Sequence, residues 1–73
     1  MKVGELVRFK SDREDYKEFH GHVGLVVSTQ EEIIRGTGKR ILHLAVKWLK
    51  PVLYDNRIAV KSHFNADRYE VLS

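Results

Sequence analysis

Gly21-His22-Val23-Gly24-Leu25-Val26-Val27 is the stretch that decides the fold of this chain. Its two glycines stand where a side chain would block the close approach of another backbone, and an uninterrupted apolar run follows them. Residues 1–10 precede it across a polar loop and have the composition of a half-buried strand. A pair of strands of this kind is typical of the start of a small five-stranded barrel.

Length and composition restrict the class of protein. A chain of 73 residues makes one domain at most, and it buries only about 60% of its unfolded surface. The sequence has no cysteine, which excludes disulfides and thiolate zinc sites. Its apolar runs are far shorter than the roughly 20 residues of a membrane helix, and the N-terminus lacks a long apolar signal run. We therefore expect a single soluble domain in the cytoplasm, with no cofactor and no membrane contact.

The net charge of +3 conceals an uneven distribution of charge along the chain. Residues 10–32 hold three basic and six acidic side chains, whereas residues 33–66 hold seven basic side chains and a single acidic one, Asp55. The middle of the chain is therefore its basic half.

Alternation of apolar residues at every second position favours strands almost throughout. The segment 41–49 has the clearest two-faced pattern, and Lys50-Pro51 is expected to end that strand because proline has no N–H for the ladder. The predicted strands are residues 3–10, 22–30, 41–49, 58–64 and 69–72.

The connections between these strands have recognisable compositions. Residues 11–20 are rich in charge without a core-forming repeat, which predicts a long loop with one helical turn at 12–16. Glycines at 36 and 38 predict a hairpin turn at 35–39. A further turn is expected at 54–57, and a short 3₁₀ turn at 65–68.

The period-two pattern also predicts which side chains form the core. Gly24 is expected to face away from the apolar side of its strand and to leave room for the neighbouring strand to cross. The predicted core residues are Leu6, Val23, Leu25, Val27, Leu44, Val46, Trp48 and Val71.

The order of strand, long loop, strand, hairpin, strand, helical turn and strand resembles that of SH3-like barrels. The first half also resembles a KOW motif: Val3-Gly4-Glu5-Leu6-Val7 matches its hydrophobic-Gly-acid-x-Val opening, and Gly21-His22-Val23-Gly24-Leu25-Val26 its Gly-x-x-Gly-x-Val closing. The whole chain is similar to small hypothetical proteins of tailed bacteriophages, which carry a central strand with tryptophan and end in a strand like Tyr69-Glu70-Val71-Leu72-Ser73.

These resemblances cover about two thirds of the residues, and segments 11–20 and 50–57 depart from them. They imply an SH3-like barrel. The KOW likeness implies association with RNA, the ribosome or RNA polymerase, and the phage likeness implies a small phage protein. Because this barrel supports many functions, the resemblance predicts the fold more specifically than it predicts the function.

Catalytic and metal chemistry find little support in the sequence. His20 and His22 point to the same side of a strand, but no third ligand accompanies them. Ser62 and His63 are adjacent in a strand and therefore face opposite sides, which excludes a nucleophile and base pair. The glycine-containing turn at 35–39 lacks the spacing of a phosphate loop and precedes no helix. We predict neither a catalytic nor a metal site, and hence a protein that is not an enzyme.

The basic half offers a candidate nucleic-acid surface. Because adjacent strands lie about 4.8 Å apart, its cations are able to form one patch along a phosphate backbone. The alternative is that these side chains serve only solubility. The candidate residues are Arg35, Lys39, Arg40, Lys47, Lys50, Arg57 and Lys61.

The loop at 11–20 offers a candidate surface for a protein partner. Aromatic side chains in charged loops need a partner or a packing role, and loops on a rigid barrel commonly carry recognition. We expect this loop to be dispensable for folding. The candidate residues are Tyr16, Phe19, Tyr54, Asp12, Glu14, Asp15 and Glu18.

Together these features favour a small non-enzymatic binding module, encoded by a phage, that docks on a host or phage protein through the 11–20 loop and the adjoining basic strands. The alternatives are a nucleic-acid-binding protein without sequence preference, using the basic surface at 35–61, and a structural component of a virion. A virion component would leave a strand edge exposed until assembly.

Overall fold

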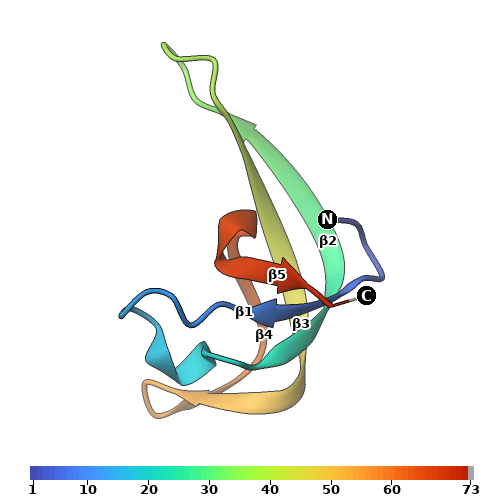
Figure 1. Cartoon of the computed structure of the whole chain (residues 1–73), viewed down its shortest axis with the longest axis vertical. Helices are drawn as coiled ribbons and strands as arrows, with labels where there is room; N and C mark the ends of the chain where they lie inside the picture. Colours follow the sequence, from blue (N-terminus) through green and yellow to red (C-terminus); the bar gives the residue numbers. More distant parts are fainter. Residues whose placement is uncertain (73) are drawn as a thin grey trace.

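The structure, a computed structural model, describes residues 1–72 and contains one antiparallel sheet of five strands (Figure 1). The strands lie in the order β4-β3-β2-β1-β5, so β4 and β5 form the two edges of the sheet. This confirms the all-β class with five strands, although the sheet does not close into a barrel. Its elements are β1 (Leu6–Phe9), η1 (Lys17–Phe19), β2 (Val23–Ile33), β3 (Arg40–Tyr54), β4 (Arg57–Asn65), η2 (Ala66–Arg68) and β5 (Tyr69–Val71).

β3 runs on past the point where Lys50-Pro51 was expected to end it. The pairing of β3 with β4 shifts between Lys47 and Val52, so Pro51 lies in a stretch without a regular ladder partner. The missing N–H of proline therefore removes no ladder bond there. Beyond this irregularity, β3 and β4 pair again as far as Tyr54 and Arg57.

The core was predicted correctly on β3 and wrongly on β1, β2 and β5. Leu44, Val46 and Trp48 are buried, as expected. On β2, and on β1 beyond it, the inward residues are instead Val26 and Val7. The predicted core residues that lie half-buried are Leu6, Val23, Leu25 and Val27, and Val71 is exposed.

Gly24 explains the inverted face of β2. A Cβ at this position would lie 2.2 Å from Cγ1 of Val46 and 2.9 Å from the carbonyl oxygen of Lys47. The predicted close approach is therefore confirmed, but it occurs on the inner face, which Gly24 shares with Val26. Val23 and Leu25 therefore lie on the other face, and Val27 is the extra residue at a register shift between Val26 and Ser28.

Aromatic side chains fill the interior near η1. Phe9 lies at the centre of this group, with ring centroids 5.0 Å from Phe64 and 5.6 Å from Tyr69. Both of these contacts are edge-to-face, the geometry that aromatic rings favour. Burial raises the pKa of the Tyr69 phenol, so this ring stays neutral and serves packing.

The turns between strands lie at their predicted positions, whereas one predicted helical turn forms elsewhere. Asp55 and Asn56 both have positive φ in the tight turn between β3 and β4. Gly36 and Gly38, also with positive φ, lie at the tip of the β2–β3 hairpin, which projects well beyond the rest of the sheet (Figure 1). The helical turn expected at 12–16 forms instead at 17–19, as η1, whereas η2 confirms the 3₁₀ turn before the last strand.

Candidate binding surface

The loop at 11–20 contributes to the core, contrary to its predicted role as an exposed recognition loop. Phe19 is only 2% exposed. Its ring centroid lies 5.0 Å from that of Tyr54 and 5.4 Å from those of Trp48 and Phe64. Phe19 is therefore not available to line the predicted groove of three aromatics, because a large apolar ring gains far more free energy in the core than at a solvated surface.

Arg68 ties the same loop to η2. Its guanidinium nitrogen donates to Oδ1 of Asp15 at 2.7 Å, and its Cζ lies 5.3 Å from the ring centroids of both Phe9 and Tyr16. This hydrogen bond lowers the pKa of the Asp15 carboxyl and raises the pKa of the Arg68 guanidinium. Asp15, a predicted partner contact, is therefore already engaged within the chain.

The other candidate residues of the loop divide between packing and solvent. Tyr16 is 40% exposed, and its ring packs 5.0 Å from Phe64 and 6.2 Å from Tyr54. Arg13 forms a second link to η2 through Asp67, at 3.4 Å. Within residues 1–72, the acidic side chains of this loop without an ion pair are Asp12, Glu14 and Glu18.

The basic residues do not form the single patch that was expected. Arg35, Lys39 and Arg40 lie at the tip of the β2–β3 hairpin, and Arg40 is paired with Glu31 at 3.3 Å. Eight residues of extended chain separate Lys39 from Lys47, which corresponds to roughly 26 Å at about 3.3 Å per residue. The long hairpin thus divides the candidate cations into a tip group and a group on β3 and β4.

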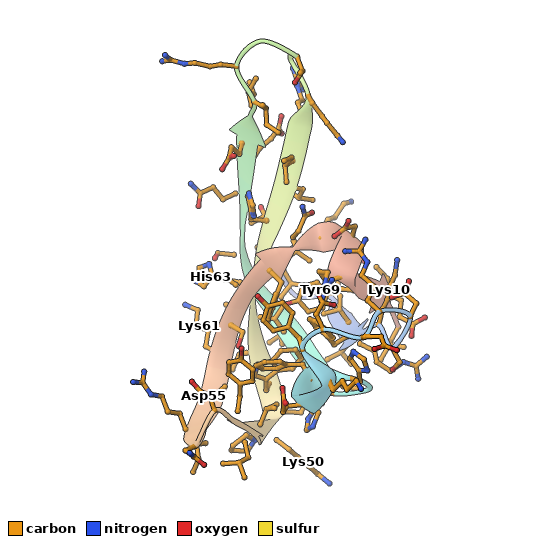
Figure 2. The ribbon with its side chains drawn as sticks, turned by 90° about the vertical axis from the view of Figure 1, so that its left-hand side faces the viewer. Lys10, Lys50, Asp55, Lys61, His63 and Tyr69 are labelled. Atoms are coloured by element: carbon orange, nitrogen blue, oxygen red, sulfur yellow. The ribbon has the colours of Figure 1, made fainter. Side chains whose placement is uncertain are left out.

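Two lysines of the second group lie directly opposite each other. Lys47 on β3 pairs in register with Lys61 on β4, and both side chains are exposed. In Figure 2, Lys61 and its neighbour His63 project from β4 away from the side of the sheet where Tyr69 lies. Neither lysine has an ion pair within the described residues. Like charges opposite each other destabilise a sheet, so this pair is a local cost to the fold.

Exposed aliphatic side chains lie on the same hairpin. Leu53 and Ile58 are cross-strand partners, and each is 69% exposed. Val60, between Ile58 and Lys61 on β4, is 50% exposed. We call this set of residues the outer hairpin surface: Lys47, Leu53, Ile58, Val60 and Lys61.

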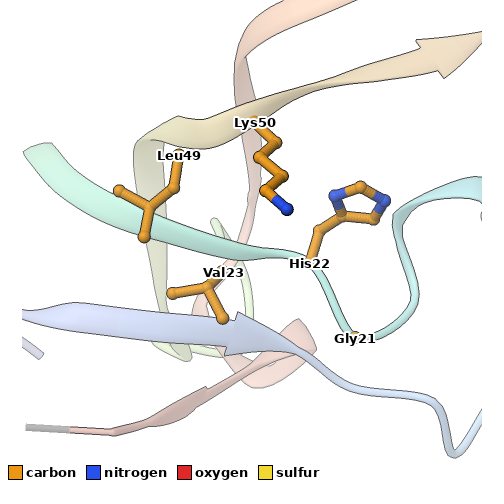
Figure 3. A pocket seen from close by; sticks show the side chains of 5 residues that line it. All are labelled: Gly21, His22, Val23, Leu49 and Lys50. Carbon is orange, nitrogen blue, oxygen red and sulfur yellow. The ribbon is translucent and has the colours of Figure 1, made fainter.

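The remaining predicted cations flank this surface. Arg57 pairs in register with Tyr54 at the end of the hairpin. Lys50 lies on the irregular part of β3, beside a shallow pocket of about 310 Å³ that His22, Val23 and Leu49 also line (Figure 3). Neither Arg57 nor Lys50 has an ion pair within residues 1–72.

Sequence reasoning missed two features of this region. The importance of Arg68 depends on contacts with Asp15 and Phe9, far away in sequence, and no local pattern announces them. The Leu53–Ile58 pair had a signal, because the predicted turn at 54–57 places these two residues opposite each other. Their exposure followed only from the path of the strands.

His20 and Ser62 make contacts within the fold. Nε2 of His20 lies 3.1 Å from the backbone oxygen of Asp15, and the His20 ring stacks on Phe9. The hydroxyl of Ser62 accepts a hydrogen bond from the indole nitrogen of Trp48 at 3.0 Å. In the described part of the chain, no three metal-ligating side chains come together.

No protein-family model, curated protein or solved structure matches this chain. The SH3-like, KOW-like and bacteriophage resemblances therefore stay predictions. Neither η1 nor η2, the helices of residues 1–72, has the length or apolar character to cross a lipid bilayer.

Proposed function

We propose that this chain is a non-enzymatic binding module that docks on a protein partner through the outer hairpin surface. The observation that carries the proposal is the exposed Lys47–Lys61 pair, which has no ion pair in the described residues and lies on the same hairpin as the exposed Leu53–Ile58 pair. An acidic partner would relieve the repulsion between the lysines, and apolar contacts would cover the aliphatic side chains.

The chemistry of this surface favours a protein over a nucleic acid. Single-stranded nucleic acids are held by cations together with aromatic rings on which the bases stack. The exposed apolar side chains of the outer hairpin surface are aliphatic, and Tyr16 is the one exposed ring among the Phe, Tyr and Trp residues of 1–72. The complementary partner is a protein surface with an apolar centre and an acidic rim.

The proposal gives the loop at 11–20 a different role from the one predicted for it. Phe19 and Asp15 act within the fold, so the loop supports the module instead of selecting its partner. The KOW-like and phage-like resemblances suggest a phage-encoded module in the host cytoplasm, with a host or phage protein of the transcription or translation machinery as its partner.

Capture from a bacterial lysate, with and without nuclease, tests this function. The wild-type chain is expected to retain a protein that survives nuclease treatment, because nucleic acid does not mediate the contact. Lys47→Glu with Lys61→Glu should abolish the capture. The matched control, Lys2→Glu with Lys17→Glu, makes the same change of net charge elsewhere and should retain it. Equal capture by both double variants would refute the proposed surface.

A second candidate function, nucleic-acid binding, is favoured by the hairpin tip. Arg35 and Lys39 lie between β2 and β3 at the tip of this projecting hairpin (Figure 1), and neither has an ion pair in the described residues. A two-stranded ribbon of this kind fits the major groove. Such binding would weaken steeply with salt and show no sequence preference. Arg35→Glu with Lys39→Glu should then weaken binding to all duplexes alike, whereas binding that does not change with salt would exclude this function.

The virion component, the third function considered, is supported by the open edge at β4. It is a special case of protein docking, and it differs in requiring other copies or other virion proteins as partners.

A further inference from the structure

A shallow pocket lies where the pairing of β2 with β3 ends. The last pair in register between these strands is Gly24 with Trp48. Within the described residues the two strands are not paired beyond that point, and a space of about 310 Å³ opens between residues 21–23 on one side and Leu49 and Lys50 on the other (Figure 3). This pocket contains none of the residues that define the outer hairpin surface, so an inference about it goes beyond the proposed function.

Backbone hydrogen bonds and ring packing hold one wall of the pocket in place. The amide of Gly21 donates to the carbonyl oxygen of Phe9 at 3.0 Å, and the amide of His22 donates to that of Phe19 at 3.0 Å. The His22 ring packs edge-on against Trp48, with ring centroids 6.3 Å apart. Sites for small ligands are usually pre-formed, and this wall has that property.

The lining of the pocket has a polar half and an apolar half. In Figure 3 the ammonium end of Lys50 points toward the ring of His22, and Val23 and Leu49 form the other side. No carboxylate of the described residues lines the pocket, and Lys50 has no ion pair within residues 1–72. Leu49, a large aliphatic side chain, is 61% exposed. A ligand that satisfies both halves therefore carries a negative charge beside an alkyl group.

We propose that this pocket binds a small aliphatic carboxylate, with its carboxylate on Lys50 and His22 and its alkyl group on Val23 and Leu49. Charge-assisted hydrogen bonds to the carboxylate are stronger than neutral ones, and burial of the alkyl carbons adds free energy in proportion to the apolar area covered. The volume lies at the lower limit for ligand pockets, which suits a group the size of one amino acid. Inorganic phosphate would leave Leu49 uncovered and so satisfies only the polar half.

Titration of the full chain with isocaproate, followed by amide NMR, tests this inference. We expect saturable shift changes at residues 21–23 and at Leu49 and Lys50. Binding should be about tenfold weaker for isocaproamide, which lacks the charge, and for acetate, which lacks the alkyl chain. Inorganic phosphate at an equal concentration should not displace isocaproate.

Substitutions in the two halves of the pocket should have different effects. Lys50→Gln is expected to weaken binding of isocaproate about tenfold and to leave binding of isocaproamide unchanged. Leu49→Ser, on the apolar half, should weaken binding of both compounds. His22→Phe keeps a ring against Trp48 but removes the ring nitrogens, and it should weaken isocaproate more than isocaproamide. The matched control, Lys61→Gln, removes the same charge outside the pocket and should bind isocaproate as the wild type does.

Two sources present this ligand chemistry: a free short-chain acid, and the last residue of a protein chain that ends in leucine. The peptide acetyl-glycyl-glycyl-leucine separates them, and binding of either compound supports the inference. About tenfold tighter binding of the peptide than of isocaproate would identify a chain terminus as the ligand, because its backbone then adds contacts outside the pocket. Equal or weaker binding of the peptide would identify a free acid.

Several results would overturn the inference. These are the lack of saturable shift changes at the pocket, equal affinity for isocaproate and isocaproamide, and full affinity for isocaproate in the Lys50→Gln variant. Displacement of isocaproate by an equal concentration of inorganic phosphate would assign Lys50 and His22 to phosphate instead. None of these results bears on the outer hairpin surface, which is tested separately by protein capture with substitutions at Lys47 and Lys61.

Discussion

The loop at 11–20 and the outer hairpin surface of β3 and β4 are both rich in charge, but their side chains find different partners. In the loop, Asp15 bonds to Arg68, Arg13 bonds to Asp67, and Phe19 enters the core. On the outer hairpin surface, Lys47 faces Lys61, and Leu53 and Ile58 remain exposed. Side chains that pair or pack within the chain stabilise the fold. We propose that the unpaired lysines and the exposed aliphatic side chains of the hairpin, which lie together, are where a partner binds.

The largest expected effect is on the loop side of this comparison. Phe19→Ala should lower the free energy of unfolding by about 3–5 kcal/mol, because it leaves a cavity between three aromatic rings. The matched substitution on the other region, Ile58→Ala, should change stability by less than about 0.5 kcal/mol because Ile58 is exposed. Urea denaturation followed by Trp48 fluorescence measures both. Equal losses of stability in the two variants would contradict the claim that the loop stabilises the fold and the outer hairpin surface does not.

Removal of the Arg68 side chain should have the next largest effect. Arg68→Ala is expected to lower the free energy of unfolding by about 2 kcal/mol, chiefly through lost packing against Phe9 and Tyr16. The ion pair itself contributes little because Asp15 is half-exposed. Arg13→Ala is the control, since both members of its pair are exposed. Thermal unfolding followed by circular dichroism measures both variants. Equal melting temperatures of Arg68→Ala and Arg13→Ala would contradict this account.

On the outer hairpin surface, a substitution that removes binding should slightly stabilise the fold. Lys61→Glu places an opposite charge across from Lys47 and should raise the free energy of unfolding by about 0.2–1 kcal/mol. Its stability gain should shrink at high salt because both side chains are exposed. Chemical denaturation at low and high ionic strength measures the effect, and a loss of stability would show that Lys61 has a structural role.

The smallest expected effect concerns pH. The pKa of Asp15 is lowered by its hydrogen bond to Arg68, so this group stabilises the fold above its ordinary pKa of 3.8. That stabilisation is lost as the pH falls through the lower pKa of the folded state. Asp15→Asn should therefore lower stability slightly at pH 7 and flatten its decline below about pH 4, so that the variant and the wild type converge at low pH. If the free energy of unfolding of the Asp15→Asn variant declined below about pH 4 as steeply as that of the wild type, this role would be contradicted.

The sequence predicted the inner and outer faces of a strand well where polar residues alternate with apolar ones. His43 and Lys47 mark the outer face of β3, and the inner face at Leu44, Val46 and Trp48 follows from them. β2 offers no such marker between Val23 and Val27, so periodicity alone did not assign its faces. The packing of Gly24 against Val46 decided them, which is a tertiary contact.

The candidate site was harder to predict because it depends on partners that are far apart in sequence. Phe19 contacts Trp48 and Phe64 across dozens of residues, and composition alone marked its segment as a solvated loop. The lysines of the basic half were identified, but their division into two groups depends on the length of the projecting β2–β3 hairpin. The aliphatic part of the surface depends on the shift in register between Lys47 and Val52.

The most direct test of the contrast between the two regions is an amide NMR titration of the full chain with a capped peptide of valine and glutamate residues, which has the apolar and acidic chemistry proposed for the partner. The result predicted here is a set of shift changes centred on residues 57–63 of β4, with the amides of 11–20 unchanged. Shift changes centred on residues 11–20, with β4 unaffected, would contradict the assignment of the loop to the fold and of the hairpin to the partner.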